Sequence, residues 1–220
     1  MAIILHIDTA VETASICLAE NNVLAGFEMN EVQKEHSSWL HPAIRRIFEM
    51  AGKSPADLDA VAVTVGPGSY TGLRVGLSAA KGLCFSLGKP LISINTLELM
   101  ASDARTEGAD FIIPVIDARR MEVFTAVYDH TLLELEKPSA LILDENSYGY
   151  FLNKGKILFT GNAVNKVRKI IRHDNVLYHE QMPTAKSMTS LALDRFISMD
   201  FSDVAYLEPM YVKEFHEAKH

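Results

Sequence analysis

One stretch determines how this chain folds: Val65-Gly66-Pro67-Gly68-Ser69-Tyr70-Thr71-Gly72-Leu73-Arg74-Val75-Gly76. Residues 60–65 are apolar and rich in β-branched side chains, which is typical of a buried parallel strand. Ser69 is placed to cap a helix that runs to Gly88. Amide groups at such a helix start can bind a phosphate or a carboxylate. The spacing matches neither a P-loop, a dinucleotide fingerprint nor a nucleophile elbow, so the turn predicts an anion site or a close packing point.

Small residues recur every four positions in the following helix, at Gly72, Gly76 and Ala80. Each glycine inside a helix costs about 1 kcal/mol relative to alanine, so this stripe requires a compensating close contact. An earlier helix, expected from Ser37 to Ala51, carries an apolar face of its own. The stripe can pack on the same chain or on a second subunit, and helix packing alone favours neither.

The composition is that of a globular protein, with 220 residues, 48% of them hydrophobic, and a net charge of −7. Nucleic-acid binding depends on basic surface, so an acidic chain is a poor match for a polyanion. Basic residues do gather between Lys154 and Arg172, but a solvated helix face explains them better. The apolar start of the chain lacks a basic leader, and no apolar run reaches the ~20 residues of a membrane span. We therefore expect a soluble, cytoplasmic protein.

The two halves of the chain begin in the same way. An apolar strand ends in Ile-Asp at Asp8, and a second one ends in Ile-Asp at Asp117. Each strand is followed by a hairpin and by alternating helices and strands, which indicates an internal duplication into two α/β lobes with mixed sheets. We expect an N-terminal lobe over residues 1–106 and an abbreviated C-terminal lobe over residues 107–220.

Candidate catalytic groups are sparse. Asp8 and Asp117 end strands, where a carboxylate can bind a metal or activate water, but capping a turn is the more common role. His36 and His41 would lie about 140° apart on a helix and cannot bind one metal from one face. Ser69 has no histidine and carboxylate placed to activate it.

Two other pairs of residues have simple explanations. Cys17 and Cys84 are too few for a disulfide framework, and we expect buried thiols. Arg119 and Arg120 could meet an anion, but an ion pair with Glu122 is the simpler expectation.

Several motifs together resemble one known family. They are Ile7-Asp8-Thr9, the turn from Gly66 to Gly76, Ala80-Lys81-Gly82-Leu83, Asp117-Ala118-Arg119-Arg120 with Glu122-Val123-Phe124, and the tail from Tyr206 to Lys213. On these segments the chain resembles the TsaB family, also called YeaZ, over nearly its whole length. The resemblance implies two RNase-H-like lobes of the actin, Hsp70 and sugar-kinase fold.

The resemblance also implies a role in making threonylcarbamoyladenosine beside the anticodon of tRNA, as the partner of a larger relative, TsaD. In TsaD an asparagine is followed by His-x-x-x-His. Asn95 matches the asparagine, whereas Thr96 and Met100 stand at the histidine positions, and neither residue replaces an imidazole on a metal. We therefore expect no metal site and no catalysis by this chain alone. The rival hypotheses are a peptidase and an ATP-dependent kinase of the same fold.

The partner surface implied by the family is a four-helix interface with TsaD. The same surface of this chain forms a homodimer when TsaD is absent. The residues expected in it are Leu40, Ile44, Ile47, Gly72, Leu73, Gly76, Leu77 and Ala80. Gly76→Leu is accordingly expected to abolish the heterodimer and to leave a folded monomer.

Other ligands are implied less directly. A TsaE-type ATPase would join the larger complex, and tRNA would bind only through that complex. We expect no intrinsic cofactor. Adenine nucleotide would bind weakly, either where the partner completes a site or at the candidate residues Asp8, Gly66, Gly68 and Ser69.

Overall fold

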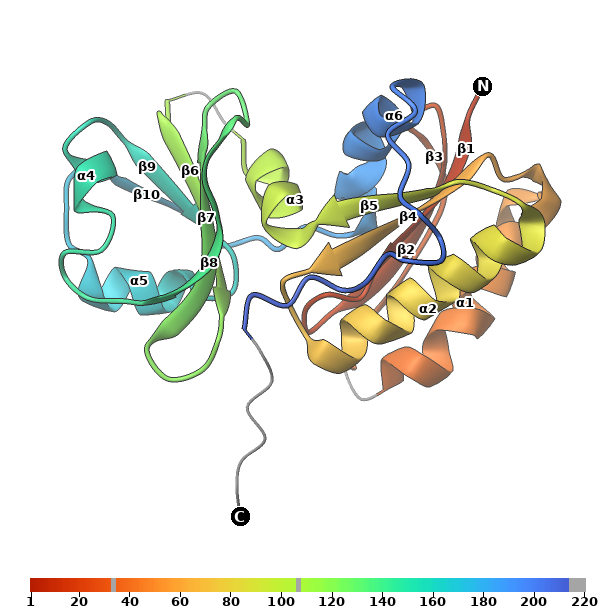
Figure 1. The fold of residues 1–220 in the computed structure, drawn as a ribbon, viewed down its shortest axis with the longest axis horizontal. Helices are drawn as coiled ribbons and strands as arrows, with labels where there is room; N and C mark the ends of the chain where they lie inside the picture. The colour runs from red at the N-terminus through yellow and green to blue at the C-terminus, as the bar shows by residue number, and fades with distance from the viewer. Residues whose placement is uncertain (33–34, 106–107, 214–220) are drawn as a thin grey trace, which may run out of the picture. The chain divides into compact units, whose positions relative to one another are not determined.

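The computed structural model describes residues 1–32, 35–105 and 108–213, which form two compact α/β units (Figure 1). The first lobe consists of Met1–Leu99 and Pro183–Met210. The second lobe consists of Met100–Met182, and the described residues 211–213 also belong to it. The expected boundary at 106 and 107 falls outside the described residues. Our assignment of residues 183–210 to the second lobe is wrong, because the helix α6 (Thr189–Ile197) packs on the first sheet.

The first lobe is built on a five-stranded sheet in the order β3-β2-β1-β4-β5. Strands β1, β2 and β3 form an antiparallel meander, and β4 and β5 continue the sheet parallel to β1. The strands span Ile3–Asp8 (β1), Ala14–Glu20 (β2), Val23–Asn30 (β3), Ala60–Gly66 (β4) and Leu91–Asn95 (β5). Because β1 and β4 are parallel neighbours, their carboxyl ends meet at one edge of the sheet.

Helices cover both faces of this sheet. The two long helices α1 (His36–Ala51) and α2 (Tyr70–Leu87) contact each other, and both pack on one face. The short turn η3 (Ala185–Met188) and α6 pack on the opposite face (Figure 1). A 3-10 turn, η2 (Pro55–Asp57), precedes β4, and α3 (Thr96–Asp103) follows β5.

The second lobe repeats the first in shorter form. Its sheet has the order β10-β9-β6-β7-β8, in which an antiparallel meander again leads to two parallel strands. The strands span Phe111–Asp117 (β6), Glu122–Asp129 (β7), Glu134–Ile142 (β8), Ile157–Thr160 (β9) and Val176–His179 (β10). Short helices accompany this sheet, namely α4 (Gly149–Leu152), α5 (Val164–Ile170) and the second half of α3, which crosses the boundary between the lobes. The duplication and the abbreviated second lobe are thus confirmed, with β1 and β6 as equivalent strands.

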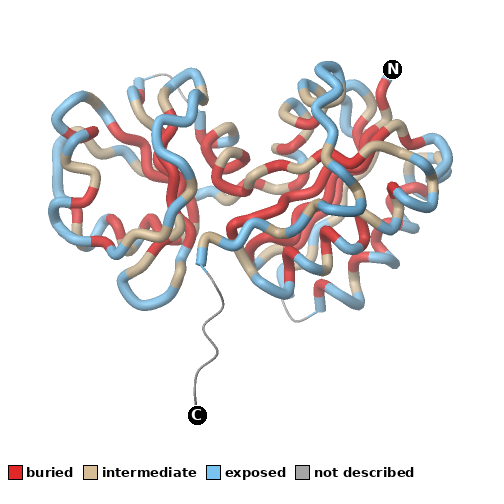
Figure 2. Tube along the Cα trace, in the orientation of Figure 1, coloured by how far each residue is buried: buried red, intermediate tan, exposed pale blue. Residues whose placement is uncertain are grey.

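Burial follows the two sheets closely. Figure 2 shows buried positions along the strands of both sheets, while buried and exposed positions alternate along α1 and α2. The pattern is that of amphipathic helices on a buried sheet. Within the described ranges, no helix is long and apolar enough to cross a membrane.

Candidate functional site

The glycine-rich turn packs against its own chain. Gly66 has a φ of +114°, and a Cβ there would lie 2.6 Å from the carbonyl oxygen of Met210. A Cβ at Gly68 would overlap the carbonyl group of Ala10, whose oxygen accepts a hydrogen bond of 2.6 Å from the backbone N–H of Ser69. These glycines are required by close backbone contacts within the lobe, which is the second of the two roles that the turn predicted.

Ser69 caps α2 as expected, because its hydroxyl accepts a hydrogen bond of 3.3 Å from the Gly72 N–H. Asp8 lies beside this turn and is only 2% exposed. Its carboxylate accepts hydrogen bonds from Thr64 Oγ1 at 2.8 Å and from the Ala10 N–H at 3.1 Å. Burial raises the pKa of the Asp8 carboxyl above its usual value, and the two hydrogen bonds oppose that shift.

The four candidate nucleotide residues therefore come together at the carboxyl ends of β1 and β4. All four, Asp8, Gly66, Gly68 and Ser69, make contacts with other groups of the first lobe. A nucleotide at this edge of the sheet would have to replace such contacts or bind outside them.

The stripe of small residues on α2 faces the sheet. A Cβ at Gly72 would overlap the carbonyl oxygen of Thr9, and a Cβ at Gly76 would overlap the Thr9 hydroxyl. That hydroxyl donates a hydrogen bond of 2.7 Å to the carbonyl oxygen of Gly72. The stripe thus allows α2 to approach the end of β1, and a leucine at position 76 would disrupt the lobe itself. Our expectation that Gly76→Leu leaves a folded monomer is wrong for this reason.

Burial also corrects the list of partner-contact residues. All eight side chains or glycines are buried within the first lobe, where most belong to the cluster between the sheet and the two long helices. Because they are covered by the chain itself, they cannot be the contact surface of α1 and α2. The residues that their burial removes from the predicted contact surface are Leu40, Ile44, Ile47, Gly72, Leu73, Gly76, Leu77 and Ala80.

The solvent side of α2 carries a different stripe, which we call the outer stripe: Thr71, Ser78, Gly82 and Phe85. These residues fall within about 60° of one another around the helix and are all exposed. No other described part of the chain lies within 4 Å of a Cβ built on Gly82, and Phe85 is 86% exposed. No role was expected for Phe85, and Gly82 was noted only as part of a family motif, because the expected stripe comprised Gly72, Gly76 and Ala80 alone.

The neighbouring helix α1 has an exposed side of mixed character. His41, Arg45, Glu49 and Met50 are exposed there, while Trp39 is half-buried against the core of the lobe. The outer stripe and this side of α1 belong to two helices that contact each other.

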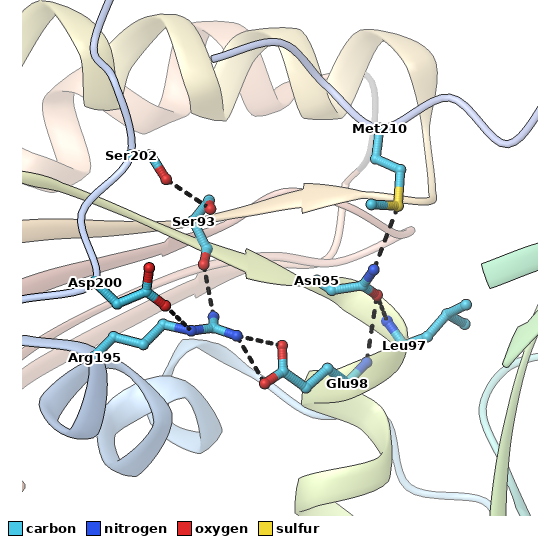
Figure 3. A network of polar contacts seen from close by, with 8 residues as sticks. All are labelled: Ser93, Asn95, Leu97, Glu98, Arg195, Asp200, Ser202 and Met210. Carbon is cyan, nitrogen blue, oxygen red and sulfur yellow. Dashed lines mark hydrogen bonds and ion pairs between the residues drawn. The ribbon is translucent and has the colours of Figure 1, made fainter. Parts of the chain in front are cut away.

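The two positions that the family resemblance aligns with the histidines of the transferase are buried in α3. Thr96 and Met100 begin and continue α3, and both are buried. Asn95 caps this helix, because its Oδ1 accepts hydrogen bonds from the backbone N–H groups of Leu97 and Glu98 at 2.8 and 3.4 Å (Figure 3). The residues described in the structure contain no group of three or more His, Cys, Asp or Glu side chains that could hold a metal ion.

The remaining candidate catalytic and metal-binding residues are two histidines, two cysteines and one aspartate, and the burial or hydrogen bonds of each explain it structurally. His36 is buried and His41 is exposed, so the two side chains lie on different sides of α1 and do not form a ligand pair. Cys17 and Cys84 are buried free thiols, and burial raises the pKa of Cys84 to about 11. Asp117 is exposed at the end of β6. Burial opposes ionisation of Asp117, but hydrogen bonds from Lys166 and the Arg119 N–H outweigh it and lower the pKa of this carboxyl.

The return of the chain to the first lobe is fixed by Arg195 of α6. Its guanidinium donates to the carbonyl oxygen of Ser93 at 2.6 Å and to both carboxylate oxygens of Glu98 at 2.7 and 2.6 Å (Figure 3). Ser202 then pairs with Leu91 at the edge of β5, and the Met210 Sδ accepts a hydrogen bond from the Asn95 side chain at 3.3 Å. No local sequence pattern indicated this role for Arg195.

Comparison with known proteins places these features in a family. A family model described as "TsaD: tRNA N6-adenosine threonylcarbamoyltransferase" matches residues 22–206. The chain is 30% identical to the tRNA threonylcarbamoyladenosine biosynthesis protein TsaB of Escherichia coli, over 96% of this chain and 94% of that protein. It is 32% identical to the protein of the same name from Bacillus subtilis, over 76% of this chain and 74% of that one.

A solved structure shows the same fold. The crystal structure of a protein with similarity to peptidase YeaZ from Pseudomonas aeruginosa has a TM-score of 0.85 and 24% sequence identity, and the match covers 97% of this chain and all of that one. The sequence matches extend over nearly the whole chain, and the fold agrees over the same length. The chain therefore belongs to the TsaB (YeaZ) family.

Proposed function

We propose that this chain is the non-catalytic partner of a TsaD-type subunit in tRNA threonylcarbamoyladenosine biosynthesis. The names of the E. coli and B. subtilis relatives support the pathway. The match to a family model named for the transferase supports a shared ancestry with the catalytic subunit. The exposed outer stripe of α2, whose glycine is not explained by packing within the described residues, supports the partner role.

The outer stripe of α2 is the single observation that carries this proposal. A glycine in a helix interior costs about 1 kcal/mol relative to alanine, and no close packing of described residues around the Cβ position of Gly82 offsets this cost. Gly82 and Ser78 offer a shallow path for a second helix, and Phe85 offers a large apolar side chain beside it. A helix of the TsaD-type subunit packing there would account for both features.

The partner surface thus consists of the exposed sides of α1 and α2, and the buried residues named in the sequence analysis support it from beneath. The same surface forms a homodimer when the partner is absent. A TsaE-type ATPase joins the larger complex, and adenine nucleotide binds weakly or at a site that the partner completes.

The absence of catalysis by this chain alone is supported by α3. On the family resemblance, Thr96 and Met100 of α3 stand at the positions of the two histidines in the transferase motif, and neither side chain replaces a neutral imidazole as a metal ligand. A peptidase would need such a metal or an activated nucleophile. A kinase would need a base for its acceptor in addition to the turn at Gly66.

The test is Gly82→Leu, followed by size-exclusion chromatography with the purified TsaD-type subunit. The variant should be folded and at least as stable as the wild type, because leucine is a better helix former and meets open space. We expect heterodimer affinity to fall at least about thirtyfold, as for a central interface residue. Gly149→Leu is the matched control, since Gly149 also lies in a helix with open space around its Cβ.

A tRNA modification assay with the adenylate-forming enzyme, the ATPase and the TsaD-type subunit completes the test. Modification should require the wild-type chain, persist with Gly149→Leu and fail with Gly82→Leu. Full modification without this chain would refute the partner role. Chelator-sensitive proteolysis or ATP-dependent phosphorylation by the chain alone would favour the peptidase or the kinase instead.

A further inference from the structure

The hairpin between β6 and β7 holds two adjacent arginines in an unusual backbone conformation. Arg119 and Arg120 have φ values of +71° and +50°. This left-handed region favours glycine and asparagine, and it costs other residues roughly 1 to 2 kcal/mol each. Both arginines are exposed. A turn that only reversed the chain would fold more easily with Asn or Gly at these positions.

The turn is held in place by Asp117. One carboxylate oxygen of Asp117 accepts a hydrogen bond of 2.6 Å from the Arg119 N–H. The same oxygen forms an ion pair with the Lys166 ammonium group at 2.7 Å. The Asp117 N–H in turn donates to the Asn162 side chain at 2.8 Å. The two guanidinium groups therefore project from a fixed backbone.

The acidic residues of this hairpin are neutralised by lysines. Asp117 pairs with Lys166, and Glu122 pairs with Lys213 at 2.5 Å. The expected ion pair between the arginines and Glu122 is not formed. Over the part of the chain that the structure describes, neither arginine side chain has a hydrogen bond or an ion pair, so two positive charges stand uncompensated at the tip of an acidic protein.

We infer that this tip, Arg119 and Arg120, contacts the phosphate backbone of the tRNA. Guanidinium groups bind phosphate oxygens through paired N–H donors and keep their charge at any physiological pH. An exposed hairpin tip suits an extended polyanion, whereas mononucleotides bind in concave sites. The inference rests on the proposed function, and it adds a direct RNA contact where the family resemblance implied binding through the complex alone.

The test compares variants of this chain in complex with the TsaD-type subunit, using an in vitro transcript of a tRNA that reads codons beginning with A. Arg119→Ala/Arg120→Ala removes both charges. Arg119→Asn/Arg120→Gly removes them and also relieves the backbone, so it should raise the melting temperature. Lys169→Ala/Arg172→Ala is the matched control, because it removes two exposed charges from another part of the same lobe. Affinity is measured by fluorescence anisotropy across a salt titration.

Both tip variants should weaken tRNA binding about tenfold or more and reduce the slope of log K against log salt by about 1 to 2. The control should bind as the wild type does, and all variants should form the heterodimer. Unchanged affinity in the tip variants, or an equal loss in the control, would overturn the inference. Loss of the heterodimer in the tip variants would also overturn it, because the arginines would then contact an acidic protein surface.

Elution of the wild-type complex before RNA is added separates this inference from the proposed function. If no heterodimer forms, the partner role fails, and the same titration on the chain alone then tests the arginines. Weaker binding by both tip variants, with the control unchanged, would support the RNA contact in that case too, and equal binding by all of them would refute it.

Discussion

Two glycines of α2 should respond to the same substitution in opposite directions. Gly82→Ala places a methyl group in open space, so the helix should gain about 1 kcal/mol of stability. Gly76→Ala places the methyl group on the buried hydroxyl of Thr9, which donates its hydrogen bond to the carbonyl oxygen of Gly72 at 2.7 Å. The first change should stabilise the first lobe and the second should destabilise it.

The size of the loss at Gly76 follows from three contributions. Overpacking a core costs about 1 to 3 kcal/mol. Displacing a buried hydroxyl from its acceptor costs about another 1 to 3 kcal/mol. The gain in helix propensity offsets about 1 kcal/mol of this. We therefore expect Gly76→Ala to lose about 3 kcal/mol, taking the middle of these ranges.

Unfolding in urea, monitored by the fluorescence of Trp39, measures this loss of stability in the first lobe. Trp39 is the single tryptophan of the chain and is half-buried against the core of the first lobe. With an m-value of about 1 to 3 kcal/mol/M, the midpoint for Gly76→Ala should fall by roughly 1 to 3 M. A variant at Gly76 that is as stable as the wild type, or a clear loss in Gly82→Ala, would refute the assigned directions of the two helix faces.

Three further outcomes are expected. Burial lowers the pKa of His6 to about 4, so the free energy of unfolding should fall as the pH drops below 6.5, by up to about 3 kcal/mol near pH 4. His6→Leu should remove this part of the loss, which a comparison of acid unfolding curves measures. Arg195→Met should cost about 1 to 3 kcal/mol in urea, because the Ser93 carbonyl loses a charge-assisted donor; unchanged stability would contradict this. Gly66→Ala should detach Met210, and hydrogen exchange of the Met210 amide, which donates to Val65, should accelerate while amides of the second lobe stay unaffected.

Much of the first lobe could be predicted from local patterns. The end of β4 at Gly66, the Ser69 cap and the C-terminal glycine of α2 each depend on residues close in sequence, and all are present. The duplication could be predicted because the β1 and β6 segments repeat one pattern, and the strand orders of the two sheets agree. Local signals were sufficient here because each feature is set within one turn or one strand.

Features set by distant residues could not be predicted in the same way. The return of α6 to the first sheet depends on Arg195 meeting Glu98 and Ser93, which are about a hundred positions away in sequence.

Strand β8 was missed for a local reason. It is an edge strand with four exposed residues before Pro138, and its pattern lacks the alternation of a half-buried strand.

The error in the partner surface had a different source, since the sequence did contain the needed information. At about 100° per residue, Gly72 and Gly76 fall on one side of the helix, whereas Gly82 lies about 120° from Gly76 and about 160° from Ala80. Three glycines in one helix therefore needed two separate explanations. Thr9 supplies the first, because it touches both buried glycines. Among the described residues, none lies within 4 Å of a Cβ built on Gly82, so the packing of the chain on itself does not explain this glycine, and for that reason the partner surface that we propose contains the outer stripe.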